Sequence, residues 1–163
     1  MVEARTDSEV QQWLDRLAIQ DLINRYSDAV TRADWDQCEA VYAPNVLWES
    51  PGLELRCEGR AAFMEMMRAT SNDGLLVQTP HASVVTLTDT DHAQATTTIH
   101  EFIRGLSVDG VQTDVDQYGV YFDNIERIDG DWKFTHRLFV PVYRGQCSPG
   151  EILASRISPL RAE

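Results

Sequence analysis

The spacing of the apolar residues changes about halfway along the 163-residue chain. Before residue 70 the spacing is mainly helical, and between Ser8 and Ala33 the apolar positions are Val10, Trp13, Leu14, Leu17, Ile19, Leu22, Ile23, Tyr26 and Val30. From about Val77 onward, apolar and polar residues alternate as they do in strands. Helices followed by strands predict an α+β fold in which the helices cover one face of a curved sheet.

Capping and turn residues set the expected boundaries of these elements. Asp34, followed three residues later by Gln37, is typical of a helix N-cap, and that helix must end before Pro44. Helices are expected at about 8–33, 34–43 and 60–70. Strands are expected at about 46–49, 53–58, 77–88, 93–105, 112–128 and 132–143. Turns rich in Asp and Gly separate the four long strands, which predicts an antiparallel sheet.

Composition and charge limit the class of protein and its partners. With 43% hydrophobic and 25% charged residues, the chain is predicted to form one domain over 1–163, with a core at about 8–143 and a tail at 144–163. A formal net charge of -12 repels phosphate backbones and anionic membrane surfaces, so neither nucleic acid nor a membrane is an expected partner. The polar, acidic N-terminus is unlike a signal peptide, which predicts a cytoplasmic location.

The common catalytic signatures and metal motifs are absent from the sequence. Cys38, Cys57 and Cys147 are far apart, which predicts free thiols. No cysteine or second histidine approaches His136 at ligand spacing, so no metal is expected. Phosphate-binding glycine loops, the GxSxG elbow and the HExxH helix do not occur. Any chemistry must therefore come from scattered polar residues that face a pocket.

Alternation in two successive strands singles out a histidine and a glutamate. His81 falls on the same face as Ser83, and Glu101 falls on the same face as Ile99 and Ile103. If these strands pair through the turn at Thr90, His81 and Glu101 can meet across the sheet. In an apolar cavity such a pair provides an acid or base that works near neutral pH. The alternative is structural, with His81 hydrogen-bonded near a strand end and Glu101 exposed at an edge.

Two residues of the first helix can border a cavity. Tyr26 lies on the apolar side of that helix, and Thr31 lies about 140° around the helix axis from it. The alternative for Tyr26 is a core residue whose hydroxyl group is satisfied by a hydrogen bond.

Two segments resemble the SnoaL-like family of the nuclear transport factor 2 superfamily. They are IQDLINRYSDAVTRADWDQCEAVYAPNVLW at 19–48 and YGVYFDNIERIDGDWKFTHR at 118–137, and the resemblance extends over about 17–143. It implies a cone-shaped, curved antiparallel sheet and three N-terminal helices that enclose an apolar pocket. The family includes scytalone dehydratase, the bile acid dehydratase and hexachlorocyclohexane dehydrochlorinase, and most of its enzymes need no cofactor, so none is expected.

The resemblance also implies roles for individual residues. His81, in the segment QTPHASVV, matches the histidine that serves as base in the dehydratases and the dehydrochlorinase. Those enzymes orient this histidine with an aspartate at the position of Thr31, so we expect Glu101 to supply the missing carboxylate. Trp48 matches a tryptophan that lines the pocket, and Tyr121 falls where scytalone dehydratase has a polar pocket residue.

The leading functional prediction is a cofactor-independent lyase or isomerase that acts on a small apolar oxygenated ring compound, such as a steroid or polyketide. His81 is the expected base, Glu101 orients it and Tyr26 donates to a substrate oxygen, while Thr31, Trp48 and Tyr121 shape the cavity. One alternative is an epoxide hydrolase or cyclase. Another is a noncatalytic ligand-binding or assembly subunit, such as the small subunit of a ring-hydroxylating dioxygenase. Apolar residues on both faces of the late strands predict a homodimer, with a trimer also open.

Overall fold

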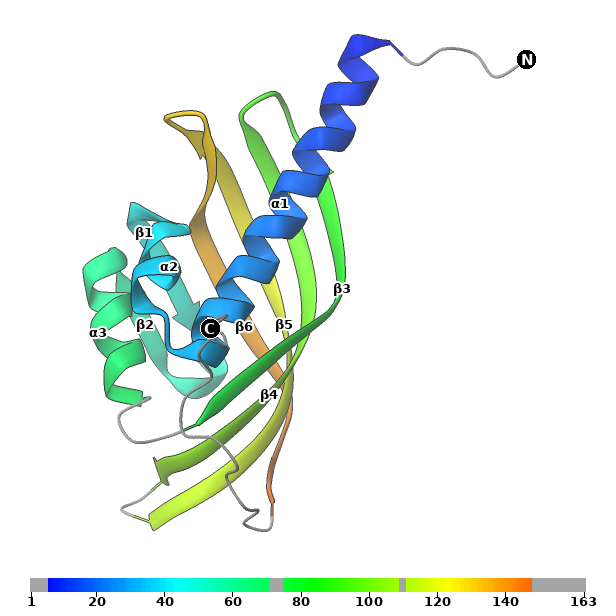
Figure 1. Ribbon diagram of the computed structural model, residues 1–163. Helices are drawn as coiled ribbons and strands as arrows, with labels where there is room; N and C mark the ends of the chain where they lie inside the picture. The colour runs from blue at the N-terminus through cyan, green and yellow to red at the C-terminus, as the bar shows by residue number, and fades with distance from the viewer. Residues whose placement is uncertain (1–5, 71–74, 109–110, 148–163) are drawn as a thin grey trace, which may run out of the picture.

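The computed structural model describes residues 6–70, 75–108 and 111–147. Its helices are α1 (Asp7–Arg32), α2 (Trp35–Ala40) and α3 (Arg60–Thr70), with the short 3-10 helix η1 (Pro51–Leu53). Its strands are β1 (Tyr42–Ser50), β2 (Leu55–Glu58), β3 (Leu76–Leu87), β4 (His92–Val108), β5 (Val111–Ile128) and β6 (Asp131–Gln146). The helices lie on one face of a curved sheet, which confirms the predicted α+β class and cone shape (Figure 1).

Helix α1 is defined at both ends by its local sequence. Thr6 and Glu9 form a reciprocal capping box at the start, and Ala33 ends the helix in the left-handed conformation, with φ 54°. Its C-terminal part buries Ile19, Leu22, Ile23, Tyr26, Ala29 and Val30. This buried set has helical spacing, and it holds α1 across the sheet, mainly against β3 (Figure 1).

The sheet has the order β2-β1-β6-β5-β4-β3. The four long strands pair antiparallel, as predicted. The prediction of a wholly antiparallel sheet is wrong at one place, because β1 pairs parallel with β6, with Trp48 opposite Arg137. Strand β1 also begins earlier than predicted, and Pro44, which has no amide hydrogen, lies within a register shift where β1 skips ladder pairing.

An irregularity in β3 decides which side chains point inward. Pro80 pairs with Ile99 and Ser83 pairs with Thr97, so β3 carries one more residue than β4 between these points. The extra residue reverses the alternation. Gln78 before this bulge and Ser83 after it both face the helices, whereas His81 is exposed on the opposite, outer face. The predicted sharing of one face by His81 and Ser83 is therefore wrong.

The core lies between the helices and the inner face of the sheet, and it gathers residues from every helix and every strand. Cys38 and Cys57 belong to it, and all three cysteines are free thiols, as predicted. No helix within the described residues is long and apolar enough to cross a membrane. The predicted tail at 144–163 begins inside β6, and its part beyond Cys147 lies outside the described residues.

Candidate functional site

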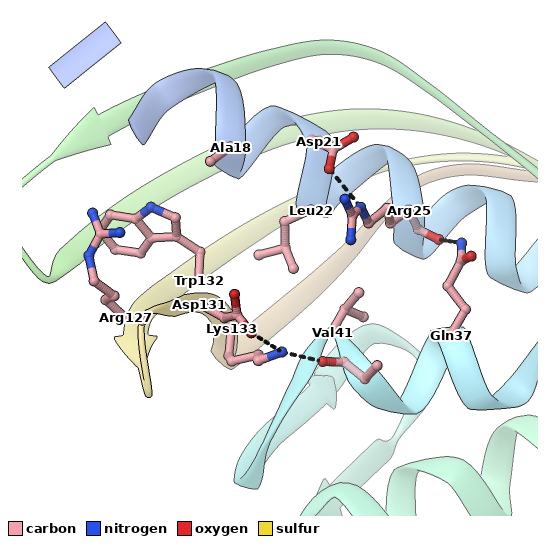
Figure 2. A pocket seen from close by; sticks show the side chains of 12 residues that line it. Ala18, Asp21, Leu22, Arg25, Gln37, Val41, Arg127, Asp131, Trp132 and Lys133 are labelled. Atoms are coloured by element: carbon pink, nitrogen blue, oxygen red, sulfur yellow. Dashed lines mark hydrogen bonds and ion pairs between the residues drawn. The ribbon is translucent and has the colours of Figure 1, made fainter. Parts of the chain in front are cut away.

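A pocket of about 400 Å³, open to the surface, lies where α1, α2 and the turn between β5 and β6 meet (Figure 2). Its charged side chains are already paired. Asp21 and Arg25 form an ion pair at 2.6 Å, and the Lys133 ammonium group donates to the carbonyl oxygen of Ala40 at 2.7 Å. Arg127 binds Asp15 at 2.7 Å, and its guanidinium lies 4.3 Å from the centre of the Trp132 ring. These internal pairs make the pocket a poor candidate for catalysis, and the polar residues of the cone interior are a better one.

The interior contains a buried arginine that several aromatic rings surround. Arg137 is only 1% exposed, and its Nε and Nη2 donate to the two carboxylate oxygens of Asp123 at 2.8 and 3.2 Å. Its guanidinium carbon lies 4.3 Å from the ring centre of Tyr26 and 4.0 Å from that of Tyr121. The positive charge is thus balanced by one carboxylate and held against the faces of the rings.

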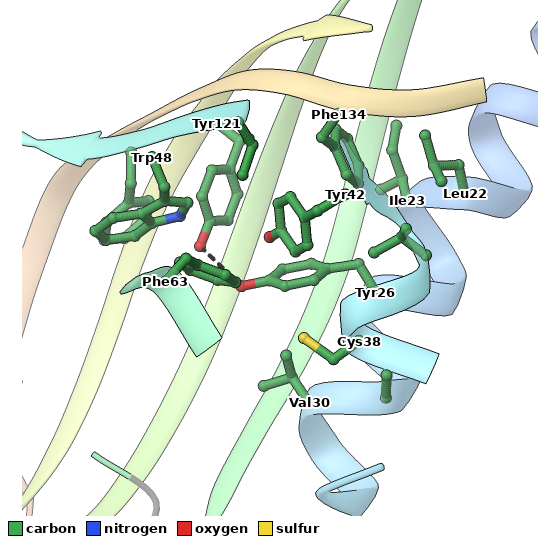
Figure 3. Packing of buried hydrophobic residues seen from close by; sticks show 14 of the residues in the cluster. Leu22, Ile23, Tyr26, Val30, Cys38, Tyr42, Trp48, Phe63, Tyr121 and Phe134 are labelled. Carbon is green, nitrogen blue, oxygen red and sulfur yellow. Dashed lines mark hydrogen bonds between the residues drawn. The ribbon is translucent and has the colours of Figure 1, made fainter. Parts of the chain in front are cut away.

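Tyr26 and Tyr121 bring two hydroxyl groups together in this interior. Their oxygens are 3.4 Å apart, and their rings meet edge to face (Figure 3). Burial raises the pKa of Tyr26 to about 12 and that of Tyr121 well above its usual value. Both groups therefore stay protonated at neutral pH and can donate hydrogen bonds to an oxygen that gains negative charge.

Trp48 and Thr31, two predicted lining residues, have different settings. Trp48 packs against Phe63 with ring centres 5.6 Å apart, and its buried Nε1 has no acceptor among the described residues. Thr31 Oγ1 accepts from the backbone N–H of Gln78 at 3.0 Å. Thr31 therefore ties β3 to the end of α1, at the position where the resemblance implies an aspartate.

Glu101 is fully enclosed next to two glutamines. It is 6% exposed, and it lies between Gln78 of β3 and Gln117 of β5 in the register of the sheet. The Gln78 amide donates to Glu101 Oε1, and the Gln117 amide donates to Glu101 Oε2. Burial raises the pKa of Glu101, while the two amide hydrogen bonds oppose that rise. Glu101 is therefore buried on the inner face, which excludes the alternative in which it is exposed at an edge.

The predicted contact between His81 and Glu101 is wrong. The bulge at 80–83 turns His81 to the outer face, where its ring is parallel to those of His100 and Tyr118, with centres 6.3 Å away in each case. His100 in turn contacts Asp116 there, at 2.5 Å between Nε2 and Oδ1. The two groups of the expected pair lie on opposite faces of the sheet.

Sequence reasoning missed Gln78, Gln117 and Ser27. Ser27 Oγ donates to Gln78 Oε1 at 2.9 Å, which connects α1 to the glutamine row. Alternation alone places Gln117 on the inner face, because it is in phase with Gly119 and Tyr121. The sequence pattern does not show the strand register, and the register is what brings these residues together. Gln78 pairs with Glu101, and Glu101 pairs with Gln117.

The described residues contain no group of three or more His, Cys, Asp or Glu side chains arranged to hold a metal ion. The enclosed apolar pocket stays a prediction, because the pocket of Figure 2 and two further pockets lined by described residues are open to the surface.

Several solved structures share this fold. A protein from Novosphingobium aromaticivorans DSM that is assigned as an aromatic ring hydroxylase is 24% identical, with a TM-score of 0.72, and the match covers 82% of this chain and 93% of that one. A second, from Novosphingobium aromaticivorans DSM 12444 and assigned as a scytalone dehydratase, is 17% identical with a TM-score of 0.75, covering 95% and 99%. A type 2 hexachlorocyclohexane dehydrochlorinase is 16% identical with a TM-score of 0.76, covering 94% and 99%.

At these identities the structural likeness establishes the fold. The comparison with curated proteins found no match. The sequence model of the SnoaL-like domain, however, matches residues 11–138, which is most of the chain. The protein therefore belongs to the SnoaL-like domain family.

Proposed function

We propose that the protein is a cofactor-independent lyase or isomerase that acts on a small, mostly apolar, oxygenated ring compound. The observation that carries this proposal is the setting of Glu101. Burial raises the pKa of this carboxyl group, whose hydrogen bonds come from neutral amides and not from cations, and a raised pKa makes its ionised form a stronger proton acceptor. The fold places it on the same side of the sheet as the paired hydroxyls of Tyr26 and Tyr121.

The proposed chemistry begins with proton transfer next to a carbonyl group. Glu101 accepts a proton from carbon, and the electron pair of that C–H bond moves onto the carbonyl oxygen. Tyr26 and Tyr121 donate hydrogen bonds to this oxygen as it becomes negative. The carbonyl group then re-forms as the electron pair returns to carbon. In a ketone with a β,γ double bond, the γ-carbon takes the proton from Glu101, and the double bond moves into conjugation, which isomerises the compound. In a β-hydroxy ketone, the returning pair forms a C=C bond and breaks the bond to the β-hydroxyl group, which takes the proton from Glu101 and leaves as water.

Electrostatic coupling supports a shared site for these three residues. Burial is the main cause of the raised pKa of Tyr26 and Tyr121, and the negative charge of Glu101 raises both further. The charge of Arg137 acts in the opposite direction on all three groups. Two of the structural neighbours bear names that denote eliminations, a dehydratase and a dehydrochlorinase, which agrees with a proton acceptor in the cone.

The proposed base is thus Glu101 instead of His81. His81 is exposed on the outer face, so it cannot reach a substrate held between the helices and the sheet. The roles of Tyr26 as donor, and of Thr31, Trp48 and Tyr121 in shaping the cavity, remain part of the proposal.

Deuterium incorporation from D2O tests the proposal without knowledge of the product. Cyclohexanone, α-tetralone and progesterone are incubated with the protein, and exchange beside the carbonyl group is followed by NMR. We expect the wild type to accelerate exchange in at least one ketone, and Glu101→Gln to lower that rate by about 10²–10⁴-fold. His81→Ala, the matched control, should retain the wild-type rate. Absence of wild-type exchange in all three ketones would count against the proposal.

A noncatalytic assembly subunit is the second candidate, and the outer face of the sheet favours it. Large apolar side chains are exposed there, with Val142 at 71%, Tyr143 at 56% and Phe122 at 46%. The neighbour assigned as an aromatic ring hydroxylase agrees with such a role. Catalysis and assembly use opposite faces, so we propose for both candidates that a second copy of the chain covers the outer face, which makes a homodimer.

A further inference from the structure

The two glutamines that hold Glu101 are not equivalent. Gln78 has a partner at each end of its amide, because its nitrogen donates to Glu101 and its Oε1 accepts from Ser27 at 2.9 Å. Its backbone N–H also donates to Thr31 Oγ1 at 3.0 Å. Gln117 donates to Glu101 through its amide nitrogen, but its buried Oε1 has no hydrogen-bond partner among the described residues. The amide of Gln78 is therefore fixed by hydrogen bonds at both its nitrogen and its oxygen, whereas the amide of Gln117 is fixed at its nitrogen only.

Protonation of Glu101 changes which hydrogen-bond partners it needs from its neighbours. An ionised carboxylate only accepts hydrogen bonds, so two amide nitrogens suit it. A protonated carboxyl group carries an O–H that needs an acceptor in a buried site. The oxygen of Gln78 is already used by Ser27, whereas the oxygen of Gln117 is free to become that acceptor.

Among the described residues, the hydrogen bonds to the carboxyl oxygens of Glu101 come from Gln78 and Gln117 and not from the charged and titratable groups around it. Arg137 and Arg144 of β6 lower its pKa from a distance, and a guanidinium group has only donors. The Tyr26 hydroxyl of α1 and the Tyr121 hydroxyl of β5 are directed at each other. Within the part of the chain that the structure describes, Gln117 is the group next to Glu101 with an unused acceptor.

We infer that Glu101 takes up its proton on Oε2 and that the side-chain amide of Gln117 flips on this protonation, which exchanges the positions of its nitrogen and oxygen. The flip replaces an N–H donated to Oε2 by a C=O that accepts from it, while Gln78 keeps its orientation. Gln117 is thus a positioning residue that stabilises both protonation states of Glu101. Its importance for turnover rests on the proposed function, but the coupled motion itself does not.

Side-chain amide NMR of the full-length protein tests this inference directly. The signals of the two glutamines are assigned by their loss in Gln78→Met and Gln117→Met, and spectra are recorded from about pH 4 to 9 together with the Glu101 carboxyl carbon. We expect the Gln117 amide signals to shift or broaden as Glu101 titrates and those of Gln78 to move several-fold less. In Glu101→Gln, the matched control, neither amide should follow pH.

A double variant separates this coupling from a general effect on packing. Ser27→Ala removes the hydrogen bond that occupies Gln78 Oε1, so in Ser27→Ala/Gln117→Met the freed Gln78 amide should follow the titration of Glu101. Equal movement of both amides in the wild type would overturn the inference, as would a Gln117 signal that stays fixed through the titration. A Glu101 that does not titrate in this range would also overturn it. Failure of the deuterium assay would remove the proposed function and leave this result to stand alone.

Discussion

Glu101 lies in a setting that disfavours its charge. Burial raises its pKa, and its direct hydrogen bonds within the described chain come from neutral amides. In the unfolded chain the same group regains its ordinary pKa, so ionisation is easier after unfolding than before. Glu101 therefore contributes stability that is fully present below its unfolded pKa and is lost as pH rises through its folded pKa.

This difference predicts how stability depends on pH. The free energy of unfolding of the wild type should fall between the ordinary pKa of a glutamate and the raised pKa of Glu101. In Glu101→Gln the part of that fall that Glu101 causes should disappear, so the free energy of unfolding of the variant should decline less as pH rises. Urea unfolding at a series of pH values measures the effect, and the exposed Glu65→Gln serves as control. Parallel pH profiles for all three proteins would contradict the assignment.

The buried hydroxyl groups of Tyr26 and Tyr121 lead to a prediction about the rate of ketone exchange. Tyr26→Phe and Tyr121→Phe should each lower the rate of ketone exchange by roughly 10²–10³-fold, because each removes one donor to the developing negative oxygen. Since the pKa of Tyr26 is about 12, the wild-type rate should show no loss from ionisation of this tyrosine near neutral pH. Tyr143→Phe, which changes an exposed hydroxyl, is the control. Unchanged rates in both buried variants would remove the tyrosines from the mechanism.

At the level of single residues, alternation predicts side-chain direction only as far as a strand stays regular. It places Glu101 correctly, because β4 is regular on both sides of that residue and pairs with both neighbouring strands there. It misplaces His81, because the extra residue after Pro80 reverses the phase. Family resemblance has the same weakness, since it carries over a residue type and not the direction of its side chain.

Among the secondary-structure elements, β5 and β6 pack closely at a residue without a side chain, Gly119. A Cβ atom on Gly119 would lie 2.2 Å from the Phe139 ring and 3.0 Å from the carbonyl oxygen of Val140. Phe139 is buried and packs on Tyr121 with ring centres 5.0 Å apart. The glycine therefore makes room for the ring that supports one of the two proposed donors.

Gly119→Ala should destabilise the protein by about 1–3 kcal/mol, because Phe139 must leave its position to admit a methyl group. Chemical unfolding measures the loss, and Thr98→Ala, on the exposed face of β4, is a suitable comparison. The same change should also lower ketone exchange through the displacement of Tyr121. A neutral effect on stability would mean that the ring adapts without cost.

The elements themselves were largely predictable, because capping residues and turns mark their ends locally. The parallel pairing of β1 with β6 was not. Glu49 of β1 and His136 of β6 lie 3.0 Å apart at their side chains and 87 residues apart in sequence. No local pattern signals a contact over that separation, and the prediction of an entirely antiparallel sheet failed there.

On the scale of the whole molecule, Arg137 links elements from both halves of the chain. It binds Asp123 of β5 and donates to the Tyr42 hydroxyl of β1 at 3.2 Å, and it lies against Tyr26 of α1. Burial raises the pKa of Asp123, and the charge and hydrogen bonds of Arg137 oppose that rise. Removal of the arginine therefore leaves a buried carboxylate without its partner.

Arg137→Met should destabilise the protein by about 3–5 kcal/mol, the usual cost of breaking a buried ion pair. Asp123→Asn/Arg137→Met should recover part of that loss, because no charge is left buried. A double-mutant cycle in urea separates the two effects. If the double variant is no more stable than Arg137→Met, the packing of the arginine on the rings matters more than its charge.

The outer face of the sheet gives a prediction for assembly. Val142→Lys adds a charge to the most exposed of the apolar side chains there, so it should convert the proposed dimer to a monomer without loss of the circular dichroism signal. Sedimentation velocity measures the change, and Leu17→Lys, on the exposed part of α1, is the control. A wild type that sediments as a monomer would contradict the proposed homodimer.

The parallel pairing of β1 with β6 affects how the protein is made. At roughly 5–20 residues per second, about 4–17 seconds of synthesis separate the appearance of β1 from that of its partner. During this time β1 has only β2 beside it, and its other edge presents unpaired amide and carbonyl groups. Ribosomes that translate the same message hold their nascent chains close together. The free edge of β1 is therefore the part of each chain that is most exposed to mispairing with a neighbouring chain. Faster synthesis of the segment between β1 and β6 should therefore improve the yield of folded protein.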